Sequence, residues 1–358
     1  MEIVQKYNPT FAIMKGFAIV GVVVGHCTMY KELEAYVNQY HLAVFFFVAG
    51  YFLTDKYVEH PNLLVRKRIK SLYLPFVFSG IVCIIFHNLL VKIHVYDTTL
   101  SCREMLLGGV NLAFKLFSTE PLMGAMWFCP TLLIVSAISI YVLWGGNKNI
   151  KHSRMVTLLL MLLVVTCGEM AQKIMHLKSP YCIWQNMVIS GILFEGWLFR
   201  KYLERYMPKN FIVSLFIGFG ITLILIITVS LGWNVRLQVA YVKEIPSVRL
   251  LGISLLSCIM IYVFSKIIIN TMVGNVLALL GNHSFSIMLL HFFSFKLVSL
   301  LICIYEGLNY SRISDFPIIP YDNNIWFFAY VVVGCILPVV IVKIKNLILK
   351  KICCLKWA

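Results

Sequence analysis

The sequence predicts an all-α, polytopic membrane protein of about ten transmembrane helices, with both termini in the cytoplasm. Of its 358 residues, 60% are hydrophobic and only 13% are charged, and the mean hydropathy is +0.87. A chain with so few polar groups cannot coat a soluble domain with them. Apolar runs of about 18 residues or more recur along the whole chain, as bilayer-spanning helices require. Basic residues fall in the short connections between these runs, which is typical of oriented membrane helices.

The predicted spans follow one another without a long linker or an internal repeat, so residues 1–358 are expected to form a single membrane domain. They cover residues 11–29, 41–54, 72–93, 122–144, 155–174, 181–199, 211–233, 248–269, 276–303 and 325–344. The first is expected to be an uncleaved signal anchor. The second is short, and a tilted, re-entrant or extended segment would suit it. Residues 97–120, of mixed charge, predict an amphipathic helix at the interface.

The net charge of +16 indicates membrane orientation rather than nucleic-acid binding. With the N-terminus inside, twenty lysines and arginines fall on the cytoplasmic side and ten on the other. This imbalance supports two cytoplasmic termini and an even number of spans. The eleven cysteines show no metal-ligand spacing and are expected to be reduced and inert.

Lys15 and His26 lie eleven residues apart in the first span. At about 100° per residue they share a helix face, roughly 16 Å apart along the axis. Lys15 is then expected near the cytoplasmic surface and His26 in the outer part of the membrane. A snorkelling anchor for Lys15 and a packing histidine for His26 are the alternatives. An ionisable group inside a span is costly to insert, which favours a functional role for His26.

Two further histidines are predicted to reach the depth of His26. His41 opens the second span on the outer side, and His291 lies about fifteen residues into the ninth. An interfacial position for His41 and a bridge between helices for His291 are the alternatives. His283, beside Asn282, is instead expected at a helix end. No HExxH pairing accompanies these histidines, so no metal is expected.

A basic cluster, RKRIKSLYLP, occupies residues 66–75 just before the third span. Guanidinium groups such as Arg66 and Arg68 pair bidentately with phosphate, so the cluster indicates either a phosphate-binding patch or only the positive-inside signal. Pro75 is expected near a helix start. Glu195, in the middle of the sixth span, is expected to pair with another helix or to face a wet cavity.

Several of these stretches together resemble the acyltransferase-3 family of bacterial membrane proteins. The first helix of that family typically reads R-G, an apolar run and G-H, which KGFAIVGVVVGH matches with the same separation. The motif H-x-x-x-F-F-F-x-S-G-Y is matched by HLAVFFFVAGY. A basic cluster before L-x-P, a WFL segment and a late S-x-x-I-Y-L-x-H are matched by RKRIKSLYLP, WFC and SFSIMLLH. Lys15, Ala49 and Ser71 depart from the arginine, serine and second basic residue typical of the family.

The resemblance implies transfer of an acyl group, most often acetyl, from a cytoplasmic acyl-CoA to a hydroxyl of a cell-surface or exported carbohydrate. It also implies a place in the inner membrane of a bacterium, among membrane lipids. Acyl-CoA would be the donor substrate, with no metal and no nucleic acid involved. The sequence sets no oligomeric state.

The hypothesis assigns roles to six residues. Those expected to bind the CoA phosphates are Lys15, Arg66 and Arg68. His26 is expected to take the proton from the attacking sugar hydroxyl, and His41 or His291 to orient the base or stabilise the oxyanion. A two-step route through an acyl group on His26 is an open alternative.

Two other function classes compete with acyl transfer. A transporter or flippase for a glycan or lipid-linked sugar also needs many spans with polar residues inside, although the sequence has no internal repeat. A non-enzymatic membrane sensor or scaffold is the other.

Overall fold

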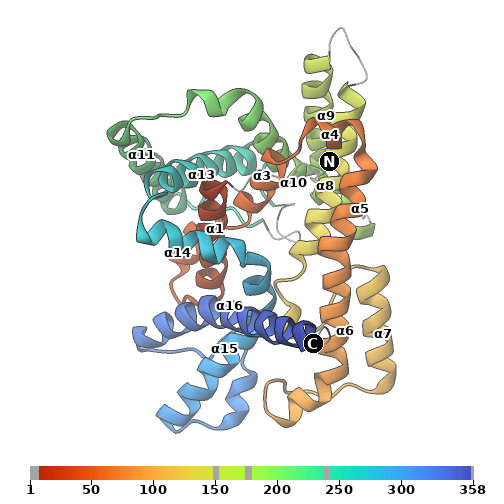
Figure 1. Ribbon diagram of the computed structural model, residues 1–358, viewed down its shortest axis with the longest axis vertical. Helices are drawn as coiled ribbons and strands as arrows, with labels where there is room; N and C mark the ends of the chain where they lie inside the picture. Colours follow the sequence, from red (N-terminus) through yellow and green to blue (C-terminus); the bar gives the residue numbers. More distant parts are fainter. Residues whose placement is uncertain (1–7, 148–152, 174–179, 238–241, 243, 356–358) are drawn as a thin grey trace.

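The computed structural model describes residues 8–147, 153–173, 180–237, 242 and 244–355. Every regular element within these residues is a helix or helical turn, and no strand occurs among them, which confirms the all-α prediction (Figure 1). Eight helical segments of the described chain are long and apolar enough to cross a membrane. The protein is therefore a multi-pass membrane protein. The count of ten spans and the cytoplasmic termini stay predictions.

Most of the helices are connected by short loops or single helical turns, and longer connections precede α13 and α16. Their bounds are α1 Pro9–Cys27, α2 Lys31–Asn38, α3 Ala43–Tyr51, α4 Asp55–Glu59, α5 Pro61–Arg68, α6 Leu74–Lys92, α7 Cys102–Phe114, α8 Phe128–Asn147, α9 Ser153–Lys173, α10 Ile183–Leu198, α11 Phe211–Ser230, α13 Ser247–Ile267, α14 Met272–Asn282, α15 Ser284–Glu306 and α16 Asn324–Leu355.

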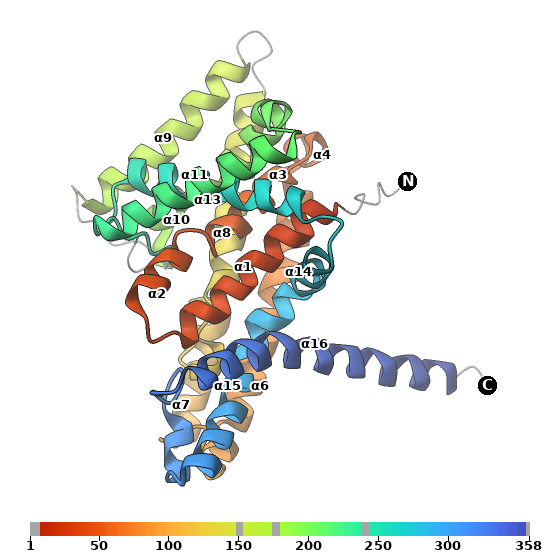
Figure 2. The ribbon, with the colours of Figure 1, turned by 90° about the vertical axis from the view of Figure 1, so that its left-hand side faces the viewer.

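Helix α1 is the element around which the site is built. The side chain of Asn8 caps it by accepting from the Thr10 amide, and Pro9 stands in the first turn, where its missing N–H costs nothing. α1 packs against α2, α3 and α13 and also against α14, α15 and α16, so helices from early and late parts of the chain surround it (Figure 2). At Gly16 a Cβ atom would lie 2.1 Å from the Leu277 carbonyl oxygen, so only glycine allows α1 and α14 to approach this closely.

The helix that carries the third predicted span, 72–93, begins well before it, because α5 and α6 form one continuous helical segment from Pro61 to Lys92. They are joined by a π-turn at Ile69–Tyr73. Pro75 stands in the first turn of α6, as predicted, but the continuous segment extends before it, and there Pro75 has no N–H to donate. The wider π-turn just before it accommodates this missing bond. The basic cluster consequently lies on the helix itself, and its side chains point in different directions.

The ninth predicted span, 276–303, is wrong as a single helix. The chain forms α14 up to Asn282 and a separate α15 from Ser284. His283 stands between them, and its ring Nδ1 donates to the Leu279 carbonyl at 2.9 Å, so the predicted helix-end position of His283 is confirmed. His291 is thus only two turns into α15. Hydropathy did not reveal the break, because the sequence stays apolar on both sides of it.

Two predicted spans are short helices. α3 rises about 14 Å and α10 about 24 Å, less than the roughly 30 Å of a hydrocarbon core. The helical form of α3 excludes an extended segment for residues 41–54. α7 lies within residues 97–120, with Ser101 and Glu104 forming its capping box, which confirms a helix there.

The outer helices expose large apolar side chains. Phe78 of α6 is 71% exposed, Leu162 of α9 61% and Phe216 of α11 76%. Such faces are unstable in water and suit contact with lipid. α1, α3 and α8 are mostly buried within this outer set, which places the polar residues that they carry in the interior.

Candidate active site

A basic cavity of about 400 Å³ opens beside the first half of α1. Three cations line it, Lys15 from α1 and Lys67 and Arg68 from α5, together with Asn8, Asn282 and Tyr57. None of the described residues that line it is an aspartate or glutamate. The cavity therefore carries an uncompensated positive charge, which suits an anionic ligand.

The arginines of the basic cluster point to different places. Arg68 lines the basic cavity, and its buried Nε has no hydrogen-bond partner among the described residues. Arg66 does not line it; it borders a shallow surface groove with Lys70. Consecutive helical residues point about 100° apart, so they cannot all face one cavity. Lys67 borders both spaces and was not among the residues predicted to bind phosphate.

A second cavity, of about 230 Å³, lies at the other end of α1 and is here called the histidine cavity. His26 from the last turn of α1 and His41 from the α2–α3 connection both line it. Four further polar or aromatic residues complete its wall: Glu34, Asn38, Trp127 and Arg236. The three histidines that the sequence grouped do lie together, because the ring of His291 stacks on that of His26 with 5.4 Å between centroids.

The surroundings of two histidines fix their neutral tautomers. Nδ1 of His41 lies 2.7 Å from the Val37 carbonyl oxygen. Nδ1 of His291 lies 3.0 Å from the carbonyl oxygens of Ile287 and Met288. A carbonyl oxygen only accepts, so in both rings Nδ1 carries the proton and Nε2 presents a lone pair. The Nε2 of His291 is buried without a hydrogen-bond partner among the described residues.

Two anchors hold the wall of the histidine cavity. α2 carries Glu34 and Asn38 one turn apart, and it is fixed by Gln39, whose amide donates to Thr228 Oγ1 at 2.8 Å. The turn that leads to Trp127 follows Glu120. That buried carboxylate pairs with His87 of α6 at 2.9 Å. Both anchors join segments far apart in the sequence, so no local motif marks them.

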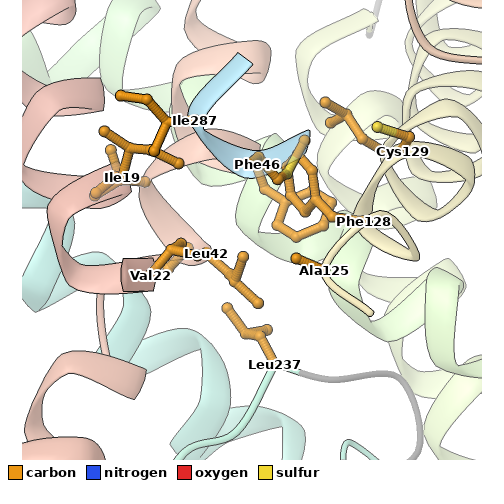
Figure 3. Packing of buried hydrophobic residues seen from close by; sticks show 14 of the residues in the cluster. Ile19, Val22, Leu42, Phe46, Ala125, Phe128, Cys129, Leu237 and Ile287 are labelled. Carbon is orange, nitrogen blue, oxygen red and sulfur yellow. The ribbon is translucent and has the colours of Figure 1, made fainter. Parts of the chain in front are cut away.

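An apolar layer separates the two cavities. It consists of Ile19, Phe46 and Phe128, which are at most 4% exposed. On α1, Ile19 lies between Lys15 of the basic cavity and Val22 of the histidine cavity. Phe128 likewise lies between Trp127 of the histidine cavity and Leu132 of the basic cavity. The rings of Phe46 and Phe128 are in contact, with centroids 5.1 Å apart. Figure 3 shows the layer as part of one buried cluster.

The remaining candidates lie outside both cavities. Glu195 of α10 lines neither, and its Oε2 is buried without a hydrogen-bond partner among the described residues. Lys296 of α15 donates to the carbonyl oxygens of Ile313 and Asp315 and so holds the turn after α15. Within the described chain, no group of three or more His, Cys, Asp or Glu side chains is placed to hold a metal ion.

Comparison with family models gives one match, to the acyltransferase domain of the acyltransferase-3 family, over residues 8–343. No curated protein and no solved structure matches the chain. The matched range includes both cavities and nearly the whole helical domain, and the shared activity of that domain is acyl transfer. The protein is therefore a multi-pass membrane member of the acyltransferase-3 family.

Proposed function

We propose that the protein transfers an acyl group, most simply acetyl, from cytoplasmic acyl-CoA to a hydroxyl of a cell-surface or exported carbohydrate. On this proposal it works in the inner membrane of a bacterium. The observation that carries the proposal is the arrangement of α1, which presents Lys15 to the basic cavity and His26 to the histidine cavity. One helix thus connects an anion-binding space to a group suited to proton transfer.

The donor would bind with its phosphates in the basic cavity. Lys15, Lys67 and Arg68 supply the positive charge there, and charge-assisted hydrogen bonds to phosphate are the strong ones. The unpartnered Nε of Arg68 is a donor that such a phosphate would satisfy. Arg66, on the neighbouring groove, would act at the entrance rather than inside.

The chemistry would take place beside His26. The oxygen of the acceptor hydroxyl forms a bond to the thioester carbonyl carbon while its proton passes to His26. When the tetrahedral intermediate collapses, the carbon–sulfur bond breaks, and the CoA thiolate leaves with that proton. Such general acid–base catalysis contributes roughly 10²- to 10⁴-fold.

His41 and His291 are better suited to orienting the base than to stabilising the oxyanion. The oxyanion needs a hydrogen-bond donor. In their neutral forms His41 and His291 have already used their N–H groups on backbone carbonyls. Their Nε2 lone pairs can instead accept from a protonated neighbour. We therefore assign them to orienting and stabilising the protonated base.

The pantetheine arm would have to pass the apolar layer of Ile19, Phe46 and Phe128 to bring the thioester to His26. The arm is narrow and largely apolar, so it can replace contacts among these side chains as it enters. When no acyl-CoA is bound, the layer is closed and also keeps water out of the path that the thioester would take.

The test compares cells that carry the wild-type protein with cells that carry His26→Ala. Mass spectrometry of the surface glycan should show acyl adducts in the first and none in the second, at equal amounts of protein in the membrane. His94→Asn is the matched control, because His94 is exposed and outside both cavities. Asparagine also tolerates its φ of 60°.

Three results would contradict the proposal. Undiminished acylation by His26→Ala would remove that residue from the mechanism. A glycan without adducts in wild-type cells would exclude a carbohydrate acceptor. Movement of a glycan across the membrane without dependence on acyl-CoA would indicate a transporter.

A further inference from the structure

The histidine cavity contains polar groups that the acyl-transfer steps above do not use. Glu34 and Asn38 come from α2, Trp127 from the turn before α8, and Arg236 from the segment after α11. These three segments converge on the same small space as His26. A cavity wall assembled from three separate segments requires an explanation in terms of the molecule that binds there.

The charges on this wall cancel. Arg236 donates to the Glu34 carboxylate in an ion pair. Asn38 carries no charge, His41 is uncharged in the tautomer described above, and His26 is uncharged when it acts as the base. The pair lies at the mouth of the cavity, with side chains 45% and 32% exposed. A ligand carboxylate or phosphate would be repelled by the Glu34 carboxylate and would compete with it for Arg236. The hydroxyls of a neutral ligand can accept from Arg236 and donate to Glu34 without disturbing it.

Trp127 brings an indole ring to the cavity wall. Its ring is held edge-on to Phe128, with centroids 6.5 Å apart and an interplanar angle of 81°. The face of an indole ring is electron-rich and attracts the weakly positive C–H groups on one side of a sugar ring. Together with the hydroxyl-binding groups on the other walls, this surface suits a ring with one apolar face and a polar edge.

The size of the cavity limits how much of an acceptor can enter. Its volume of about 230 Å³ is below the ~300–1,000 Å³ of pockets that hold drug-sized ligands. One monosaccharide unit fits, and the rest of a longer glycan would lie outside the mouth.

We propose that the histidine cavity binds one uncharged monosaccharide unit, with its apolar face on Trp127 and its hydroxyls on Glu34, Asn38 and Arg236. Acyl transfer therefore prefers neutral sugars to sugars that carry a carboxylate or phosphate. This inference rests on the proposed function, because it takes the acceptor to be a carbohydrate.

The test uses the purified full-length protein in detergent with radiolabelled acetyl-CoA and two matched acceptors. Methyl glucuronamide and methyl glucuronide have nearly the same shape and differ by one negative charge. Each is measured as an acceptor and as an inhibitor of transfer to methyl glucoside, so that binding is detected even where the acylated hydroxyl is missing. The galacto forms are measured in parallel. Methyl glucuronamide should have a kcat/KM as acceptor at least tenfold higher, or an inhibition constant at least tenfold lower, than methyl glucuronide.

A charge-only variant provides the second readout. Glu34→Gln keeps the shape of the side chain and removes the carboxylate that pairs with Arg236. In this variant, kcat/KM for methyl glucuronide should rise about tenfold relative to that for the amide. The matched control is Asp315→Asn, because Asp315 pairs with Arg312 at similar exposure and does not line the cavity. Trp127→Ala should raise the KM for methyl glucoside about tenfold and leave the KM for acetyl-CoA unchanged.

The outcomes separate this inference from the function on which it rests. If the protein acylates sugars but uses glucuronide as well as glucuronamide, the neutral-sugar inference fails and the proposed function remains. An unchanged preference in Glu34→Gln also overturns the inference. If acetyl-CoA binds but no sugar of either kind is acylated or acts as an inhibitor, the carbohydrate acceptor fails and the inference fails with it.

Discussion

Neighbouring side chains of the basic cluster have different surroundings. Substituting them should therefore affect the KM for acetyl-CoA to different extents. Arg68 lines the basic cavity, whereas Arg66 lies on the surface groove beside it. A charge-assisted hydrogen bond contributes about 1.5–3 kcal/mol, and about 1.4 kcal/mol is tenfold in affinity. We expect Arg68→Ala to raise the KM for acetyl-CoA about tenfold or more, and Arg66→Ala to raise it less than threefold. Steady-state kinetics would show the reverse order if the phosphates bind in the groove.

The lone pair of His41 can be tested apart from its hydrogen bond to the backbone. In His41→Asn, the side-chain amide can still donate to the Val37 carbonyl, as Nδ1 does now, but nothing replaces Nε2. We expect kcat for acetyl transfer to fall about tenfold or more, with the KM for acetyl-CoA unchanged. His283→Asn is a matched control, because His283 makes the same bond to the carbonyl four residues earlier and lies outside the histidine cavity. A normal kcat in His41→Asn would remove His41 from the mechanism.

Among the elements, the contact between α1 and α14 positions the half of α1 that carries Lys15. It depends on Gly16, where a Cβ would lie 2.1 Å from a backbone oxygen of α14. We expect Gly16→Ala to reduce stability by about 1–3 kcal/mol, as overpacking does, and thermal unfolding in detergent would measure this as a lower Tm. Gly220→Ala in α11 is the control, since a Cβ there meets nothing within 4 Å. Its Tm should stay the same or rise.

At the scale of the whole molecule, the proposed function requires the two cavities to open to opposite sides of the membrane. Lys67 borders the basic cavity and Glu34 the histidine cavity. With the other accessible cysteines changed to serine, Lys67→Cys should react with a membrane-impermeant maleimide only in inverted vesicles. Glu34→Cys should react with the same maleimide only in intact cells whose outer envelope has been made permeable to the reagent. Labelling of both from one side would contradict a path from cytoplasmic donor to external acceptor.

How much of the site could be predicted differs along the chain. Lys15 and His26 were paired from their spacing alone, because the geometry of one helix is local. Lys67 and the separation of Arg66 from Arg68 were missed, because the sequence does not reveal where the helix at Pro61 begins. The opposite charges of Glu34 and Arg236 gave no signal either, since nothing in the sequence relates a residue of α2 to one in the segment after α11, about 200 positions later.

The sequence by itself determined that this is a helical membrane protein of the acyltransferase-3 family, since apolar run length and motif order are properties of the chain read in one dimension. Only the tertiary structure decided which polar groups share a cavity. The stacking of His26 on His291, the neutral wall around Trp127 and the apolar layer between the two cavities all depend on packing among distant helices. Helix packing is set by many small side-chain contacts at once, and no local pattern of residues encodes it.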